Sequence, residues 1–192
     1  MIRVFPVGAP TTLTNSYGEP RSGHPHAGND LFADEGAPLL AVDDGMLRSG
    51  VDVQGGNIVN LYAADGARYY YAHLQAFAAP DGTPANSTGV LPPAPRQVRT
   101  GDVVGFLGRT GNAIRTQPHL HFEARPGNGP AIDPFPALAA APRVQPNQSA
   151  DPNARALRPG PLVTAVALGL VAASIWSYTN PGGVDRLVRR FG

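Results

Sequence analysis

Glycine and proline interrupt this chain more often than long regular elements tolerate. They supply 23 and 21 of its 192 residues, well above their usual share in globular proteins. Glycine weakens a helix and proline breaks its hydrogen-bond ladder, so this composition disfavours a bundle of long helices. Many short strands joined by turns suit it better. The length is sufficient for one domain with a hydrophobic core and one appendage.

Short apolar runs between turn signals indicate an all-β domain over residues 1–140. The runs that we interpret as strands are 38–42, 57–62, 67–72, 103–107 and 119–124. Because no long amphipathic helix pattern separates them, antiparallel hairpins are favoured over βαβ units. The prolines within residues 75–97 predict a long surface loop there, because proline is excluded from central strands.

The C-terminal part of the chain changes in character. A polar, proline-rich stretch over residues 141–161 predicts an extended linker. The uncharged run that follows predicts a transmembrane helix over 162–179. Trp176 and Tyr178 lie at one end of this run, where aromatic side chains meet the membrane surface. A hydrophobic helix packed on the domain's own surface is the alternative.

Two further features of this end concern partners. Ala165, Gly169 and Ala173 recur at every fourth position, which permits a helix-mediated oligomer or a larger assembly. Residues 180–192 predict a basic amphipathic tail suited to anionic lipid, with a frayed tail as the alternative. Residues 162–191 would thus make the protein membrane-associated. Slightly more arginines follow the apolar run than precede it, which favours a domain on the cell-wall side.

Charge and residue usage exclude several classes of function. The formal net charge of +1 gives no long-range attraction to nucleic acid, so no nucleic-acid partner is expected. The chain has no cysteine, which leaves histidine and carboxylates as ligands for any transition metal. The first residues lack the charged start and apolar core of a secretory signal, so export by that route is not expected.

Histidine placement is the strongest indication of chemistry. His26 and Asp30 lie four residues apart around a glycine, and His73 follows a tyrosine-rich run. His119 and His121 would point to the same face of a strand. Each pattern alone occurs by chance, but together they use four of the five histidines.

Imidazoles and a carboxylate form a suitable open site for zinc. Two imidazoles and one carboxylate leave the fourth position of the ion to water. Such a site supports hydrolysis, because zinc activates water and polarises a carbonyl group. An imidazole nearby that is not a ligand can then transfer the proton. The residues therefore predict a hydrolytic metal site.

Several ordered motifs resemble one family. The chain is similar to lysostaphin/LytM-type zinc endopeptidases, whose signature is His-x-x-x-Asp followed far downstream by His-x-His. The resemblance covers about residues 15–136. It also includes the motifs at 41–45, 55–57, 71–74, 101–105, 108–112 and 118–123.

The resemblance implies a fold, a reaction and residue roles. The fold would be an antiparallel β-sheet or sandwich of the lysostaphin/LytM type, a duplicated hybrid motif, here followed by a C-terminal apolar helix. His26, Asp30 and His121 would hold Zn²⁺, while His119 and His73 would act on water and the transition state. The substrate would be a stem peptide or cross-bridge of bacterial peptidoglycan.

The same resemblance assigns lesser roles. Gly28 would let the backbone pass close to the metal. Asn112 and Glu123 would shape the site around the ligands. The resemblance gives His24 no role, so we expect it to be a surface residue by default.

Other functions remain to be weighed. The alternative is a non-catalytic peptidoglycan-binding or hydrolase-activating module on the same fold, although no ligand position is lost. A biotinyl or lipoyl carrier domain is excluded, because it needs a lysine and this chain has none. A membrane-seeking tail is also compatible with a virion-associated or injection-machine enzyme.

Overall fold

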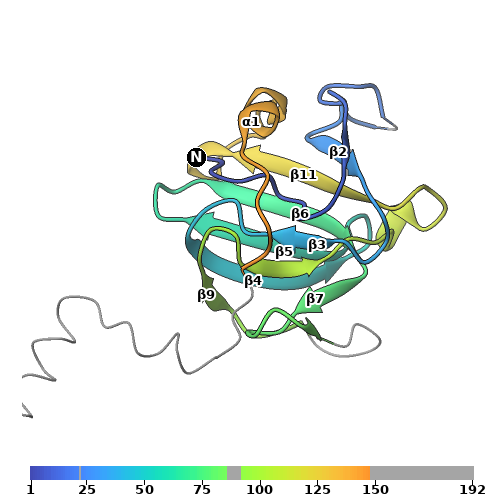
Figure 1. Cartoon of the computed structure of the whole chain (residues 1–192). Helices are drawn as coiled ribbons and strands as arrows, with labels where there is room; N and C mark the ends of the chain where they lie inside the picture. Colours follow the sequence, from blue (N-terminus) through green and yellow to red (C-terminus); the bar gives the residue numbers. More distant parts are fainter. Residues whose placement is uncertain (22, 86–91, 148–192) are drawn as a thin grey trace, which may run out of the picture. The chain divides into compact units, whose positions relative to one another are not determined.

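Two antiparallel sheets build the domain. The computed structural model describes residues 1–21, 23–85 and 92–147. The strands of the larger sheet follow the order β1-β2-β11-β6-β5-β4-β9, and those of the smaller one the order β3-β10-β7-β8 (Figure 1). Every pairing within both sheets is antiparallel. The all-β prediction is therefore confirmed.

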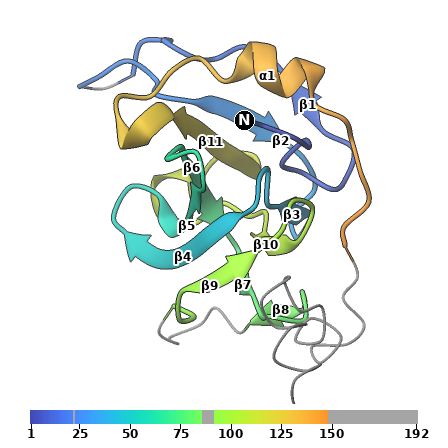
Figure 2. The same ribbon diagram turned by 90° about the vertical axis from the view of Figure 1, so that its left-hand side faces the viewer.

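The elements are short, as the glycine and proline content predicts. The larger sheet contains β1 (Thr12–Leu13), β2 (Asn29–Phe32), β4 (Gly45–Asp52), β5 (Gly56–Ala63), β6 (Arg68–Leu74), β9 (Arg96–Val98) and β11 (His119–Arg125). The smaller sheet contains β3 (Pro38–Leu40), β7 (Ala76–Ala78), β8 (Pro84–Ala85) and β10 (Val103–Phe106). The described helices are η1 (Gly111–Ala113), η2 (Pro126–Asn128) and α1 (Phe135–Ala140). Figure 2 shows α1 beside β1 and β2, at the end of the domain opposite β7 and β8.

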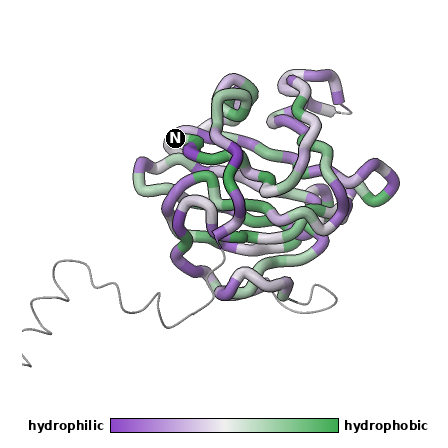
Figure 3. Tube along the Cα trace, in the orientation of Figure 1, coloured by the Kyte–Doolittle hydropathy of each residue, from purple (hydrophilic) through white to green (hydrophobic). Residues whose placement is uncertain are grey.

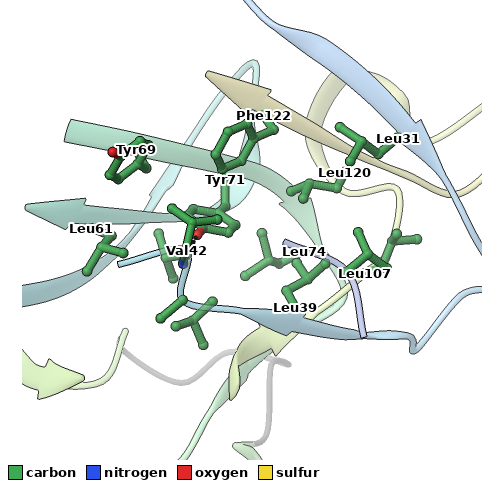
Figure 4. Close-up of a cluster of buried hydrophobic side chains, with 14 of the residues drawn as sticks. Leu31, Leu39, Val42, Leu61, Tyr69, Tyr71, Leu74, Leu107, Leu120 and Phe122 are labelled. Carbon is green, nitrogen blue, oxygen red and sulfur yellow. Dashed lines mark hydrogen bonds between the residues drawn. The ribbon is translucent and has the colours of Figure 1, made fainter. Parts of the chain in front are cut away.

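The core lies on the inner face of the larger sheet. Alternate residues of β5, β6 and β11 point inward, and hydrophobic positions concentrate on these strands (Figure 3). Tyr71 and Phe122 are fully buried there with leucines from both sheets (Figure 4). The Tyr71 hydroxyl donates to the Leu40 carbonyl at 3.0 Å and accepts from the Val42 amide at 3.1 Å. This core fixes the sheet whose outer face carries the histidines.

The prediction of a long surface loop over residues 75–97 was partly wrong. β7 is a buried strand inside the smaller sheet, and Phe77 belongs to the core. The strand is tolerated because it ends before the first proline, Pro80. The proline in β8 sits on the edge strand of its sheet, as its missing N–H requires. Residues 86–91 lie outside the described residues.

The C-terminal predictions fall largely outside the described part. The transmembrane helix predicted over 162–179, the C-terminal apolar helix and the tail over 180–192 all lie there. Within the described part, no helix is long and apolar enough to cross a membrane. The first residues after α1 still bond to the domain. The Phe5 amide donates to the Pro142 carbonyl, and the Asn147 amide donates to the Gly101 carbonyl, each at 2.9 Å.

Candidate metal centre

Strand pairing brings two of the predicted metal ligands together. In the register of β2 with β11, Asp30 lies directly opposite His121, so both side chains point to the same face of the sheet. His119 precedes His121 by two residues and shares that face. The prediction that the His-x-His pair lies on one strand face is confirmed.

The loop before β2 brings in His26. Its backbone amide donates to the Glu19 carbonyl at 2.9 Å, which fixes the loop across its base. Gly28 then lets the chain pass close to β11, because a Cβ atom there would overlap the Phe122 carbonyl oxygen. In the structure, the close approach that requires glycine is to the neighbouring strand. The predicted approach of Gly28 to a metal ion stays a prediction.

Three ligand atoms converge at this point. His26 Nε2 lies 2.8 Å from His121 Nδ1, and Asp30 Oδ1 lies 3.1 Å from each of them. His26 and Asp30 are buried, and His121 is half-buried. The structure thus brings together His26, Asp30 and His121 as a group that could hold a metal ion.

Hydrogen bonds on the far side of each ring orient these histidines. His26 Nδ1 donates to the Ser16 carbonyl at 2.8 Å. A carbonyl oxygen can only accept, so Nε2 is left with its lone pair. His121 Nε2 lies 3.1 Å from Glu123 Oε1, which likewise leaves the Nδ1 lone pair facing inward. Three acceptors therefore face one another, an arrangement that fits a cation.

The carboxylates of the site stay ionised. Burial opposes ionisation, yet the neighbouring His121 and His26 rings hold the pKa of Asp30 far below its ordinary value. Burial likewise opposes the ionised form of Glu123, but bonds from His121 and Arg125 lower its pKa. Burial lowers the pKa of His121, but the neighbouring carboxylates of Asp30 and Glu123 outweigh this and raise it. Asp30 therefore offers an anionic oxygen to a metal ion, and Glu123 keeps a negative charge beside His121.

A bulge delivers His73 to the same place. Between the pairs Asn57–Leu74 and Val59–Tyr71, β6 advances three residues while β5 advances two. His73 sits in this extra-residue segment with a φ of 69°, a left-handed conformation rare for histidine. Bulges next to active sites re-aim side chains in this way. Here the His73 ring comes to lie 4.9 Å from the His119 ring, centroid to centroid.

His73 and His119 are held in the same tautomer. His73 Nδ1 donates to the Thr110 carbonyl at 3.0 Å, and His119 Nδ1 donates to the Gln117 carbonyl at 2.8 Å. Each Nε2 is left as a proton acceptor. Burial, assisted by the neighbouring His119, lowers the pKa of His73 to about 4. His73 is therefore neutral at neutral pH and is able to accept a proton.

Sequence reasoning missed two residues of the site. Arg21 donates from its guanidinium to Asp30 Oδ2 at 2.8 Å, and the buried Ser16 hydroxyl accepts from the Asp30 amide at 3.0 Å. A loop arginine and a loop serine carry no pattern that would have indicated this. Glu123 lies beside its ligand as expected. Asn112 is exposed, and so is His24, whose ring bonds to the Pro25 carbonyl.

The fold and the site together define a class of protein. An antiparallel β domain that carries two histidines and an aspartate for a metal, with two further histidines beside them, is the arrangement of a hydrolase centre. The chain belongs to peptidase family M23, whose model matches residues 24–134.

Several known proteins are similar to this chain. The DD-carboxypeptidase/endopeptidase Mpg of Neisseria meningitidis is 36% identical over 120 residues, 62% of this chain and 24% of the relative. The glycyl-glycine endopeptidase ALE-1 of Staphylococcus capitis is 33% identical over 126 residues, 62% of this chain and 31% of the relative. The chain thus spans about a quarter to a third of the length of these two relatives.

Solved structures agree with this assignment. The catalytic domain of the antimicrobial peptidase lysostaphin from Staphylococcus simulans aligns with a TM-score of 0.54 and 30% identity. The alignment covers 68% of this chain and 93% of that domain. The expected lysostaphin/LytM fold is confirmed for the β domain.

Proposed function

We propose that this protein is a zinc-dependent endopeptidase that hydrolyses peptide bonds in bacterial peptidoglycan. The observation that carries the proposal is the convergence of three lone-pair atoms within 3.1 Å, from His26, Asp30 and His121. Nitrogen and oxygen donors in this number suit zinc and leave one position open. Membership of a peptidase family and similarity to named endopeptidases support the reaction class.

The residues of the centre would have two roles: some would hold the metal ion, and others would transfer protons. His26, Asp30 and His121 would hold the ion, and Ser16 and Glu123 would fix the two rings. A bound zinc ion would activate a water molecule and polarise the scissile carbonyl group. His119 Nε2 lies 3.9 Å from Asp30 Oδ1, so this imidazole lies within reach of the same point.

His73 and His119 would share the proton transfer. In both rings Nδ1 is bonded to a backbone carbonyl, so Nε2 is the atom that can take a proton and return it to the leaving amine. Their backbone partners, the carbonyls of Thr110 and Gln117, prevent either ring from turning. Loss of one imidazole is expected to reduce turnover by about 10²- to 10⁴-fold while zinc stays bound.

Digestion of purified peptidoglycan by the full chain tests this proposal. We expect soluble muropeptides from the zinc-loaded protein, and none after chelation or in His121→Ala. His119→Gln should bind zinc but release almost nothing, which separates metal loss from loss of the proton acceptor. Zinc binding without release from several wall types would instead support the non-catalytic binding or activating module.

We further propose that residues 162–191 associate the protein with a membrane, with the domain on the cell-wall side. The uncharged run and the arginines after it support this. Fractionation of the full chain and of a truncation after residue 161 tests the anchor. Recovery of the full chain in purified virions would instead favour the virion-associated alternative, and a soluble full chain would contradict both the anchor and its topology.

A further inference from the structure

The outer face of the larger sheet continues beyond the metal centre as a row of arginines. His121, Glu123 and Arg125 alternate onto the same face of β11. The register places Arg68 of β6 opposite Arg125, and Tyr62 of β5 opposite Arg68. β11, β6, β5 and β4 lie side by side in that order (Figure 1).

A third arginine joins them from the next strand. Arg48 of β4 lies on the same outer face, because Met46, two residues earlier, is opposite Tyr62. The Arg48 guanidinium carbon lies 5.5 Å from the centroid of the Tyr62 ring. We refer to Arg48, Arg68 and Arg125 as the arginine patch.

The patch is unfavourable for the free protein. Like charges directly opposite each other across two strands destabilise a sheet, and Arg68 faces Arg125 in this way. Arg125 is compensated by Glu123, whose Oε2 accepts from Arg125 Nε at 2.7 Å. In the described part of the chain, neither Arg68 nor Arg48 forms an ion pair with a carboxylate.

One buried donor in the patch lacks a partner. Among residues 1–21, 23–85 and 92–147, Arg68 Nε is shielded from solvent and finds no hydrogen-bond partner. Buried donors are seldom left unsatisfied, because each costs about 1–3 kcal/mol. An anionic ligand would compensate the charges of Arg48 and Arg68. Arginine is suited to this, since its planar guanidinium binds a carboxylate through two parallel hydrogen bonds.

The patch is continuous with the metal centre. Tyr70, which lies opposite Glu123, packs edge-on against His121 with ring centroids 6.1 Å apart. Four residues of β11 separate His121 from Arg125, a distance of about 13 Å at the rise of a strand. An extended peptide of about four residues covers the same distance. A substrate bound at the metal would therefore reach the arginines.

We propose that the arginine patch binds carboxylate groups of an acidic peptide that extends from the metal centre. This inference rests on the proposed function and deepens it, because it names the substrate class. The carboxylate-bearing stem peptide of peptidoglycan fits such a surface, whereas an uncharged glycine cross-bridge gives it nothing to bind. The patch therefore selects among bonds that the metal centre alone would treat alike.

Peptide binding to the full chain tests the inference independently of catalysis. The probes are a fluorescent extended hexapeptide with two glutamates and the same peptide with two glutamines. In metal-free protein, fluorescence anisotropy should show about tenfold tighter binding of the acidic peptide, with about threefold from each of Arg48 and Arg68. Arg48→Gln/Arg68→Gln should abolish the preference, and added salt should weaken it. Arg143→Gln, which removes a charge stacked on Phe5, is the control.

The outcomes separate the two proposals. Equal binding of both peptides, or a preference that survives in Arg48→Gln/Arg68→Gln, would overturn the arginine patch as a binding site. Cleavage of peptidoglycan by the zinc-loaded wild type tests the proposed function by itself. If the wild type cuts nothing yet prefers the acidic peptide, the patch stands and the enzyme does not. The double variant should still bind zinc as the wild type does, which verifies its fold.

Discussion

Replacement of Glu123 by alanine should weaken zinc binding without touching a ligand. Glu123 is buried, and its Oε1 lies 3.1 Å from the His121 nitrogen that faces away from the site. Its other oxygen accepts from Arg125 at 2.7 Å. The carboxylate therefore keeps the proton on His121 Nε2 and the lone pair on Nδ1. Without it, His121 would be free to take the other tautomer, which cannot bind the ion.

The expected loss of zinc affinity in Glu123→Ala can be estimated from the hydrogen bond that is removed. Removal of a carboxylate behind a ligating histidine typically costs about 10- to 100-fold in metal affinity, or roughly 1.4–2.8 kcal/mol. A value towards the upper end is expected here, because Glu123 is buried and ionised. Glu123→Gln keeps an oxygen that accepts from His121 but loses the charge. Glu123→Gln should therefore lose less zinc affinity than Glu123→Ala.

Competition between the protein and a chromophoric chelator measures these affinities. Glu35→Ala is the matched control, since Glu35 is 40% exposed and pairs with Arg109 at 3.6 Å. The d–d spectrum of the cobalt-substituted protein reports in addition whether the ligand geometry changes. If Glu123→Ala binds zinc within threefold of wild type while His121→Ala does not, Glu123 does not orient the ligand and the reasoning fails.

Three further perturbations test the fold around the site. Gly28→Ala should destabilise the protein by ~3 kcal/mol or more in urea unfolding, and weaken zinc binding, because its Cβ would push β2 away from β11; an unchanged midpoint would refute this. Tyr71→Phe should cost about 2–4 kcal/mol by the same assay, since two buried backbone groups lose their partner, and a loss below about 1 kcal/mol would contradict it. The folded-state pKa of His73 is about 4, below its ordinary 6.5, so its contribution is complete above pH 6.5 and is lost as the pH falls towards 4. His73→Asn should remove roughly 3 kcal/mol of that dependence in metal-free protein, whereas parallel stability curves would exclude the shift.

The strands were predictable where their own residues show the apolar pattern of a strand. Apolar runs rich in β-branched and aromatic residues predicted β5, β6, β10 and β11 to within two residues of their ends. β4 was missed, because only Leu47 among its eight residues is buried and its glycines disguise the alternation. β2 was missed because it is a four-residue strand that begins with two polar residues. Both strands are defined by their neighbours more than by their own residues.

The sequence indicated which residues gather at the site, but only part of their geometry. The histidine and aspartate positions indicated a metal centre, and the structure brings His26, Asp30 and His121 together. Ala72 lies opposite His121 on the outer face of the sheet. Strict strand alternation would therefore have pointed the next residue, His73, into the core. Only the bulge in β6 and the positive φ at His73 reverse this. A bulge depends on the pairing of two strands, so no single stretch of sequence reveals it.

Asp30 and Glu123 contact the centre in the same way, and each accepts a hydrogen bond from an arginine. Asp30 turns Oδ1 towards the histidines and bonds through Oδ2 to Arg21, while Glu123 turns Oε1 to His121 and bonds through Oε2 to Arg125. Each arginine fixes one oxygen and thereby aims the other. The positive charge of each arginine weakens the attraction of its carboxylate for a metal ion. The arrangement therefore gives up some metal affinity in return for a fixed orientation of the carboxylate. Fixed orientation matters in a hydrolytic centre, because a displacement of about 1 Å in a catalytic group can lower a rate about 100-fold.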